Sequence, residues 1–408
     1  MPAGICQPSF SRVLPPANQS LGRLPAVSIS LKWRMFLSAT MAALLIFGYN
    51  GATAHAAPAT SAQSAVVMEQ SSRRVLFQKN AHQPLPMAST TKIMTALVAL
   101  KHGHLDDRVK VGPHAAGVEG SSIYLKAGET WTLEQLLFGL MLQSGNDAAV
   151  AIAEHVGGSM DGFLALMNDE AAKLGAVDTH FATVNGLDKA GHCTSAYDLA
   201  LITAAAMDDA DFRRIVGSKS AVIGEGDVRR AIPNKNKLLW RMDGANGVKT
   251  GYTKGAGRCF VGAAQRGGMQ LIAVVLNCGP MFEDSQALME DAFARYSMVT
   301  VALPGLVLGE APTEQGQRGT VRYGFGHALA LPLDTEERRR VAVQVESPGA
   351  VEAPIAEGQP IGQAKVYLDG EELRTVELVA LQDEKQRTWR WYADRLVEGM
   401  LWRGKDSP

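Results

Sequence analysis

Ser89 and Lys92 are residues whose types and spacing could do chemistry. They stand three residues apart at the start of a predicted helix, and residues i and i+3 share one helix face. Residues 91–100 are apolar on nearly every side, which predicts a buried helix ending near Gly103. A lysine in apolar surroundings loses solvation and can be neutral near pH 7. A neutral lysine beside a serine is a base beside a nucleophile.

Taken alone, the pair has an ordinary alternative. Ser89 could be an N-cap and Lys92 a surface residue, since typical composition places about one Ser-x-x-Lys in such a chain by chance. Two further triplets follow, Ser-Gly-Asn at 144–146 and Lys-Thr-Gly at 249–251. Singly, the first is typical of a turn and the second of a strand end. The three motifs in this order favour acyl transfer by an activated serine.

The motifs and their flanking residues resemble the active-site-serine penicillin-binding proteins. The matching stretches are Pro-Met-Ala-Ser-Thr-Thr-Lys at 86–92, Leu-Gln-Ser-Gly-Asn-Asp at 142–147 and Gly-Val-Lys-Thr-Gly-Tyr-Thr at 247–253. The chain is similar to the low-molecular-mass members, the serine D-alanyl-D-alanine carboxypeptidases. The resemblance implies an α+β catalytic domain of the β-lactamase/transpeptidase type, an antiparallel sheet with a helical cluster. A small all-β domain and a C-terminal amphipathic helix are expected to follow it.

The resemblance also implies roles in acyl transfer. Ser89 is the expected nucleophile, and Lys92 is the expected base that takes its proton. Ser144 stands on a turn between two helices and is expected to relay a proton to the departing amine. The backbone N–H groups of Ser89 and Tyr252 are expected to face the developing oxyanion.

Four residues are expected to hold the substrate. Asn146 offers an amide to its peptide carbonyl. Lys249 and Thr250 offer a cation and a hydroxyl that suit a free carboxylate. Gly251 lets the substrate backbone approach the strand edge as an added strand. The expected partners are therefore peptidoglycan pentapeptide and, as inhibitors, β-lactam antibiotics.

Hydrophobic patterns predict the elements around these motifs. Residues 65–69 and 75–78 predict a hairpin, and helical patterns run through 133–143, 147 onward, 160–174, 195–207 and 211–216. Strands are predicted at 247–252, 258–264 and 269–277, before a helix at 284–296. The catalytic domain is thus expected at 57–299 and the small β domain at 300–382.

The tail from residue 383 has a separate pattern. Trp389, Tyr392, Leu396 and Met400 recur at helical spacing, with charged residues on the other side. A tryptophan-rich amphipathic helix on an exported protein can lie in a membrane interface. The alternative is a helix packed on its own β domain. We expect 383–408 to associate with the membrane.

The N-terminus predicts export. Residues 1–56 contain four Lys or Arg and no Asp or Glu, and an apolar run at 35–49 precedes Ala54-His55-Ala56. That order is typical of a cleaved signal peptide, although the 30 residues upstream could reflect a misassigned start. The protein is therefore expected at the outer face of the cytoplasmic membrane. Cys259 and Cys278 flank one predicted hairpin, and a disulfide between them stays open.

Other functions are less favoured. The formal charge of −1 does not indicate nucleic-acid binding. The chain contains no zinc-protease His-Glu-x-x-His, and neither a metal nor a cofactor is expected. His102 and His104 are interpreted as surface residues. The loop pieces at 185–188 and 192–195 match the family and are interpreted as structural, the alternative being an edge of the active site.

Three functional alternatives stay open. A class A β-lactamase would need a second base for rapid hydrolysis of the acyl-enzyme, and no glutamate in the expected context lies between Asn146 and Lys249. An endopeptidase would need room for a bulkier leaving group. A β-lactam sensor or wall-binding scaffold with a vestigial site would not need Ser89, Lys92, Ser144 and Lys249 intact, and a sensor would be expected to carry a spanning helix or a signalling module.

Overall fold

The computed structural model describes residues 58–224 and 226–403. The predicted signal peptide at 1–56 lies outside the described residues. Within the described ranges, no helix combines the length and the apolar character that a membrane span requires.

The first part of the chain is built on an antiparallel sheet of five strands in the order β2-β1-β9-β8-β7. Its strands are β1 (Ser64–Glu69), β2 (Val75–Lys79), β7 (Ala245–Thr253), β8 (Gly257–Arg266) and β9 (Met269–Leu276). The predicted hairpin and the three later strands are thereby confirmed. Strand β7 is an edge strand, so one side of it is free to pair with an extended ligand.

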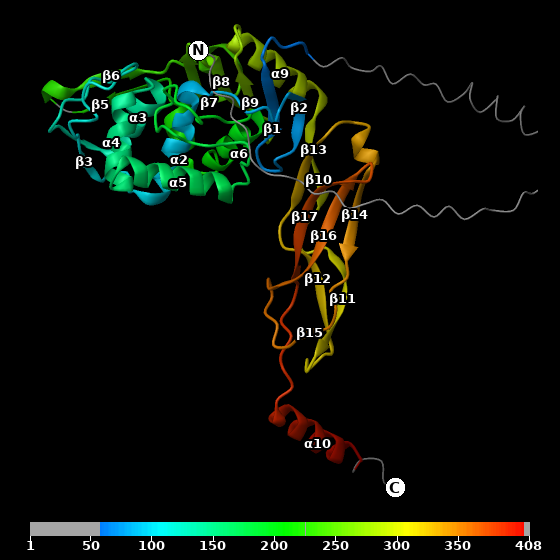
Figure 1. Cartoon of the computed structure of the whole chain (residues 1–408). Helices are drawn as coiled ribbons and strands as arrows, with labels where there is room; N and C mark the ends of the chain where they lie inside the picture. Colours follow the sequence, from blue (N-terminus) through cyan, green and yellow to red (C-terminus); the bar gives the residue numbers. More distant parts are fainter. Residues whose placement is uncertain (1–57, 225, 404–408) are drawn as a thin grey trace, which may run out of the picture. The chain divides into compact units, whose positions relative to one another are not determined.

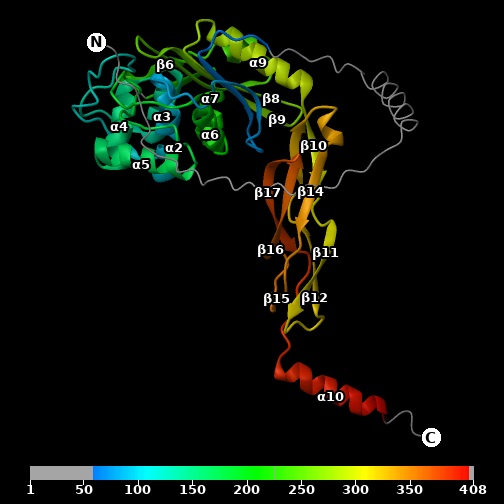
Figure 2. The ribbon, with the colours of Figure 1, turned by 45° about the vertical axis from the view of Figure 1, so that its right-hand side comes forward.

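Helices cover both faces of this sheet (Figures 1 and 2). They are α2 (Lys92–His102), α3 (Leu133–Leu142), α4 (Asn146–Gly157), α5 (Met160–Lys173), α6 (Ala196–Ala206), α7 (Ala210–Gly217), α8 (Leu238–Arg241) and α9 (Met281–Arg295). Alternate residues of β1 and β9 enter two different cores, one packed around α2 and the other under α9. Because both faces are covered, β9 is buried along its whole length, which explains its continuous hydrophobic run.

Short pairs of strands flank the helices. They are β3 (Arg108–Lys110) with β4 (Thr130–Thr132), and β5 (Ser220–Ile223) with β6 (Arg230–Pro233). Thr132 forms a capping box with Gln135, which fixes the start of α3.

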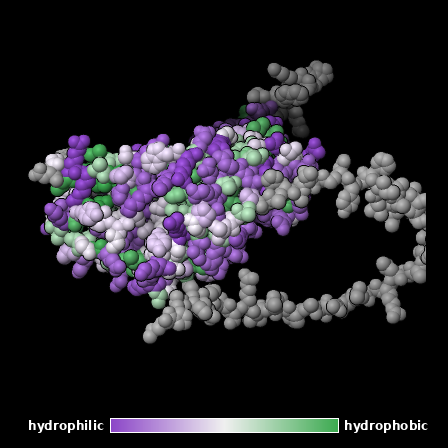
Figure 3. Space-filling model, turned by 90° about the horizontal axis from the view of Figure 1, so that it is seen from above, coloured by the Kyte–Doolittle hydropathy of each residue, from purple (hydrophilic) through white to green (hydrophobic). Residues whose placement is uncertain are grey.

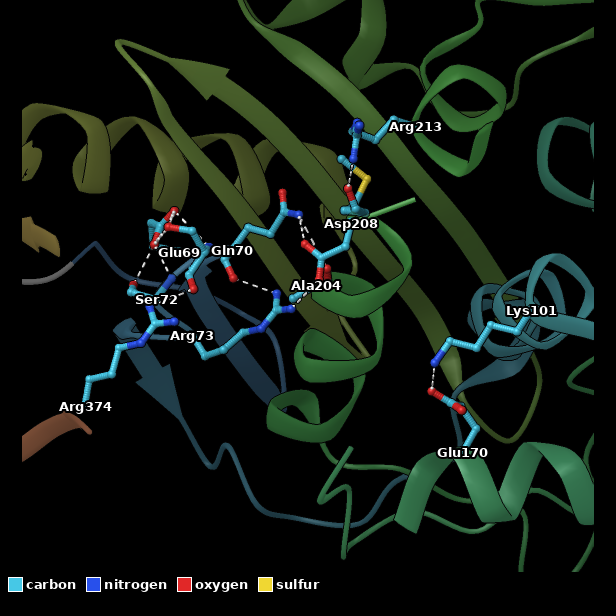
Figure 4. A network of polar contacts seen from close by, with 12 residues as sticks. Glu69, Gln70, Ser72, Arg73, Lys101, Glu170, Ala204, Asp208, Arg213 and Arg374 are labelled. Carbon is cyan, nitrogen blue, oxygen red and sulfur yellow. Dashed lines mark hydrogen bonds and ion pairs between the residues drawn. The ribbon is translucent and has the colours of Figure 1, made fainter. Parts of the chain in front are cut away.

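Helix α2 is held at its far end, away from Ser89. Lys101 forms an ion pair with the buried carboxylate of Glu170 on α5. On the sheet side, the Glu69 carboxylate accepts hydrogen bonds from Ser72 in the turn after β1, and Arg73 in that turn pairs with Asp208 at 2.7 Å (Figure 4). The first contact holds α2, which carries Lys92, against α5, and the last joins the turn after β1 to the residues that follow α6.

The C-terminal part is all-β until its last helix, as expected. A six-stranded sheet has the order β14-β16-β17-β12-β11-β15, and β10 pairs with β13. The strands are β10 (Ser297–Ala302), β11 (Val307–Glu314), β12 (Thr320–Phe325), β13 (Leu329–Leu333), β14 (Val341–Glu346), β15 (Val351–Glu352), β16 (Pro360–Leu368) and β17 (Glu371–Ala380). They enclose their own hydrophobic core.

The final helix, α10 (Trp389–Arg403), follows residues that form isolated β-bridges with the loops of the C-terminal part. Glu384 bridges to Ile355, and Gln386 bridges to Gly316. Four large apolar side chains of α10 are more than half exposed, Trp389, Tyr392, Leu396 and Val397, whereas Trp391 is only partly exposed. By contrast, Figure 3 shows a face of the molecule that is mainly hydrophilic, with scattered small hydrophobic areas.

Cys259 and Cys278 are both buried and free. Cys259 lies in the core around α2, and Cys278 lies in the core under α9. The sheet therefore separates the two thiols, and the disulfide that the sequence left open is not formed.

Candidate active site

A tight turn presents Ser89 to the site. The 3-10 helix η1 (Ala88–Thr91) leads directly into α2, whose first residue is Lys92. The helix begins as predicted, but its first turn is 3-10, so Ser89 stands just before the regular helix. This arrangement aims the side chains of Ser89 and Lys92 at each other.

Lys92 is completely buried and has three polar neighbours. Its Nζ lies 3.0 Å from Ser89 Oγ, 2.7 Å from Asn146 Oδ1 and 2.5 Å from the carbonyl oxygen of Asn185. The last two atoms can only accept hydrogen bonds, whereas a serine hydroxyl can also donate. A neutral amine has two N–H groups for the two acceptors and a lone pair for the Ser89 hydroxyl.

The surroundings of Lys92 favour this neutral form. Burial lowers its pKa well below the usual value, and the nearby charges of Lys249 and Lys235 lower it further. The carboxylate of Asp147 opposes the shift, but it ranks last among the causes. Lys92 is therefore suited to accept a proton.

Ser144 and Asn146 lie on the connection between α3 and α4. Ser144 is buried and adopts a left-handed conformation with a φ of 64°, which lets the chain turn sharply before α4 begins at Asn146. Asn146 donates from Nδ2 to the Glu119 carbonyl and from its backbone N–H to the Ser121 carbonyl. One N–H of its side-chain amide stays available for a ligand.

Strand β7 forms the opposite wall. Lys249 is buried, and its Nζ donates to the Thr250 carbonyl at 2.8 Å. Burial, and after it the charge of Lys235, lowers the pKa of Lys249 to about 7. At Gly251, an added Cβ would lie 3.0 Å from the backbone nitrogen of Ser89. Only a residue without a side chain lets β7 approach the nucleophile so closely.

A pocket of about 570 Å³ joins these walls. Its lining residues are Ser89, Ser121, Ser144, Asn234, Lys235, Lys237, Thr250, Gly251, Tyr252, Arg258, Met281 and Phe282. Three of them carry positive charges, and none is an aspartate or glutamate. The described pocket is therefore suited to an anionic ligand.

The structure thus brings all eight predicted site residues together. Ser89, Ser144, Thr250, Gly251 and Tyr252 line the pocket. Lys92, Asn146 and Lys249 are buried beside it. The site is assembled from η1, α2, the α3–α4 connection and one edge strand.

Two contributors escaped the sequence analysis. Asn185, in the loop interpreted as structural, contacts Lys92 through its backbone carbonyl. Every residue carries a carbonyl, so residue type gave no signal. Lys235 bonds to the Gln143 carbonyl at 2.8 Å and to Ser121 Oγ at 3.3 Å. Between Asn234 and Asn236 it looked like an ordinary surface lysine.

Comparisons with known proteins show the family to which the chain belongs. Residues 51–279 match the family model of D-alanyl-D-alanine carboxypeptidase, Peptidase_S11, and residues 296–386 match that of the penicillin-binding protein 5 C-terminal domain. D-alanyl-D-alanine carboxypeptidase DacF of Bacillus subtilis is 32% identical over 80% of this chain and 87% of its own length. The DacC enzyme of Escherichia coli is 33% identical over 81% and 86%.

A solved structure shows the same likeness. Penicillin-binding protein 5 from Haemophilus influenzae is similar with a TM-score of 0.68 and 29% identity, covering 81% of this chain and 99% of the other. The resemblance inferred from the motifs is confirmed by these matches. The chain belongs to the Peptidase_S11 family, the D-alanyl-D-alanine carboxypeptidases.

Proposed function

We propose that this protein hydrolyses the terminal D-alanine from peptidoglycan stem peptides that end in D-Ala-D-Ala, through an acyl-enzyme on Ser89. The observation that carries the proposal is the contact between buried Lys92 and Ser89 Oγ, at 3.0 Å, beside a pocket lined with positive charges. The site therefore combines a base, a nucleophile and a binding site for a carboxylate. The family of the chain supports the same reaction.

The first step forms the ester. Ser89 Oγ attacks the carbonyl carbon of the penultimate D-alanine while Lys92 takes the hydroxyl proton. The backbone N–H groups of Ser89 and Tyr252 stabilise the oxyanion. The carbon–nitrogen bond then breaks, and a proton passes through Ser144 to the amine of the departing D-alanine. Lys92 is neutral again when this proton has left it.

The second step releases the product. Water attacks the ester, and Lys92 accepts a proton from it as the carbon–Ser89 bond breaks. That proton returns to Ser89 Oγ, and the shortened peptide is released as a carboxylic acid that loses its proton to solvent. No other residue is needed as a base.

Substrate recognition follows from charge and hydrogen bonding. Lys249 and Thr250 bind the terminal carboxylate, and Lys235 adds a second positive charge at the pocket. Asn146 donates its remaining N–H to the peptide carbonyl on the acyl side. Gly251 allows the substrate to lie along the free edge of β7.

The same site would be acylated by β-lactams. Lys92 is the base that activates water, and the described lining residues offer no carboxylate as a second base, so the penicilloyl-enzyme should hydrolyse more slowly than in a class A β-lactamase. This favours a carboxypeptidase over a β-lactamase. Endopeptidase activity on cross-links is the second candidate, because the edge of β7 leaves room for a longer chain.

The location of the protein is also a proposal. We infer that residues 57–299 act outside the cytoplasm, with 300–382 as a spacer and the tail at the membrane surface. The exposed apolar side chains of α10 support the last point, since Trp389 is 75% and Leu396 is 63% exposed.

The proposed activity is tested by incubating residues 57–408 with a diacetyl-Lys-D-Ala-D-Ala peptide and measuring free D-alanine. The wild type should release one D-alanine per peptide, and Ser89→Ala should release none. No release by the wild type, or equal release by the variant, would refute the proposal.

A further inference from the structure

We propose that His192 is a positioning residue that fixes the backbone N–H of Ser89 toward the oxyanion. It acts through the Thr91 hydroxyl and the Ala88 carbonyl. The inference rests on the proposed acyl-enzyme mechanism and adds to it a residue that touches neither the substrate nor the nucleophile's side chain.

The hydrogen bonds of His192 define its tautomer. The imidazole is 5% exposed, and its Nδ1 accepts the backbone N–H of Ala182 at 3.1 Å. Nδ1 therefore carries no proton, and in the neutral ring the proton is on Nε2. Burial lowers the pKa of His192 to about 4, so the neutral ring is present at working pH.

Nε2 lies 2.8 Å from Thr91 Oγ1 and donates its proton there. Thr91 is fully buried, and its hydroxyl lies 2.8 Å from the Ala88 carbonyl oxygen. Since the hydroxyl oxygen accepts from His192, its own hydrogen is directed to Ala88. The hydrogen bonds thus run in one direction, from His192 to Thr91 to Ala88.

The Ala88 carbonyl belongs to the same rigid peptide unit as the Ser89 N–H. In a planar trans peptide the carbonyl and the N–H point in opposite directions, so fixing one fixes the other. The unit is held in an uncommon conformation, because Ala88 has a φ of 49° without being glycine. Gly186 packs against it, and an added Cβ there would lie 2.0 Å from the Ala88 oxygen.

Without the His192 donor, the Thr91 hydroxyl is free to rotate away from the Ala88 carbonyl. The peptide unit, and with it the Ser89 N–H, then loses its fixed orientation. Loss of a whole oxyanion donor typically lowers kcat by about 10²–10³-fold. When the donor is present but poorly oriented, the rate should fall less, by about tenfold. Because the oxyanion forms only in the transition state, the acylation rate should fall while KM stays unchanged.

The test uses paired variants of the 57–408 protein, with benzylpenicillin acylation and D-alanine release as readouts. His192→Leu and Thr91→Val should each lower the acylation rate about tenfold. The double variant should lose no more than either single variant, because both break one path. Thr91→Ser and His192→Gln, which retain a hydroxyl and an N–H donor, should recover most of the rate. His180→Gln, an exposed neighbour bonded to the Gly191 carbonyl, should act as wild type.

The melting temperature of each variant shows whether a lower acylation rate comes from unfolding or from a displaced Ser89 N–H. If His192→Leu does not fold, the acylation rates of Thr91→Val and Thr91→Ser are compared, because only the second retains the hydroxyl. The inference is overturned if a folded His192→Leu or Thr91→Val acylates at the wild-type rate, if the two losses multiply, or if only KM changes. An inactive wild type would instead refute the proposed function.

Discussion

Burial and, after it, the positive charge of Lys235 lower the pKa of Lys249 to about 7. The exposed lysine at the pocket thus influences the protonation of the buried one. The same charge also lowers the pKa of Lys92. In the proposed mechanism the base Lys92 must be neutral and the carboxylate anchor Lys249 must be charged, so we expect this cluster of three lysines to set the pH range of activity.

The alkaline limit of activity should come from Lys249. Lysine is charged below its pKa and neutral above it, so kcat/KM for a carboxylate-ended peptide should fall as pH rises through about 7. Lys235→Gln removes a positive charge, which raises the pKa of Lys249. The alkaline limb of the kcat/KM profile, where activity falls with pH, should therefore move to higher pH. Lys237→Gln, in the same pocket, is the control and should leave the limb in place. An unmoved limb in Lys235→Gln would disprove the coupling.

The acid limit should come from Lys92. Burial lowers its pKa, and the amine can accept a proton only when it is neutral. Acylation should therefore decline as the pH falls through that pKa, because Lys92 becomes protonated. Lys92→Arg cannot lose its proton near neutral pH, and its acylation by benzylpenicillin should drop by about 10²-fold or more. Lys101→Arg, on the same helix, should acylate normally. Full acylation by Lys92→Arg would remove Lys92 from the role of base.

Gly186 should be sensitive to a single methyl group. Its φ of 86° and the 2.0 Å approach of a Cβ to the Ala88 oxygen predict that Gly186→Ala displaces the nucleophile turn. We expect a loss of about 1–3 kcal/mol in stability and slower acylation. Gly191→Ala is the matched control, since Gly191 has a φ of 78° but its nearest neighbour atom is 3.7 Å from the added Cβ. If both variants slow acylation equally, the left-handed backbone conformation and not the contact with the Ala88 oxygen causes the loss. If neither slows it, the prediction is wrong.

Membrane association should depend on α10. Because Glu384 and Gln386 form β-bridges with Ile355 and Gly316, the deletion should begin at Trp389. Removal of 389–408 should shift the protein from the membrane to the soluble fraction while D-alanine release from a soluble peptide stays unchanged. Replacing Trp389, Tyr392 and Leu396 by serine should act in the same direction. Unchanged partitioning would leave α10 without this role.

The sequence predicted the sheet and the site because their signals are local. The hydrophobic runs of β8 and β9, the Thr132 cap and the three motifs can be read without knowing the fold. The bridges at Glu384 and Gln386, by contrast, depend on residues tens of positions away. The strands β11 and β13 of the C-terminal part are harder to predict, because Gly309 and Pro312 interrupt the pattern of the first and Pro332 that of the second.

The parts of the site that sequence could not supply depend on tertiary contacts. Asn185 contributes a backbone carbonyl, and Lys235 acts by charge across the pocket. His192 lies 101 residues from Thr91 in the chain, so only the fold brings the two together.

The most direct test of the account is to locate the acyl group. The 57–408 protein is treated with benzylpenicillin, digested, and the modified peptide is identified by mass spectrometry. We predict one penicilloyl group per chain, on Ser89, and none on Ser89→Ala. A group on any other residue, or a wild type that stays unmodified, would contradict the assignment of Ser89 as the nucleophile.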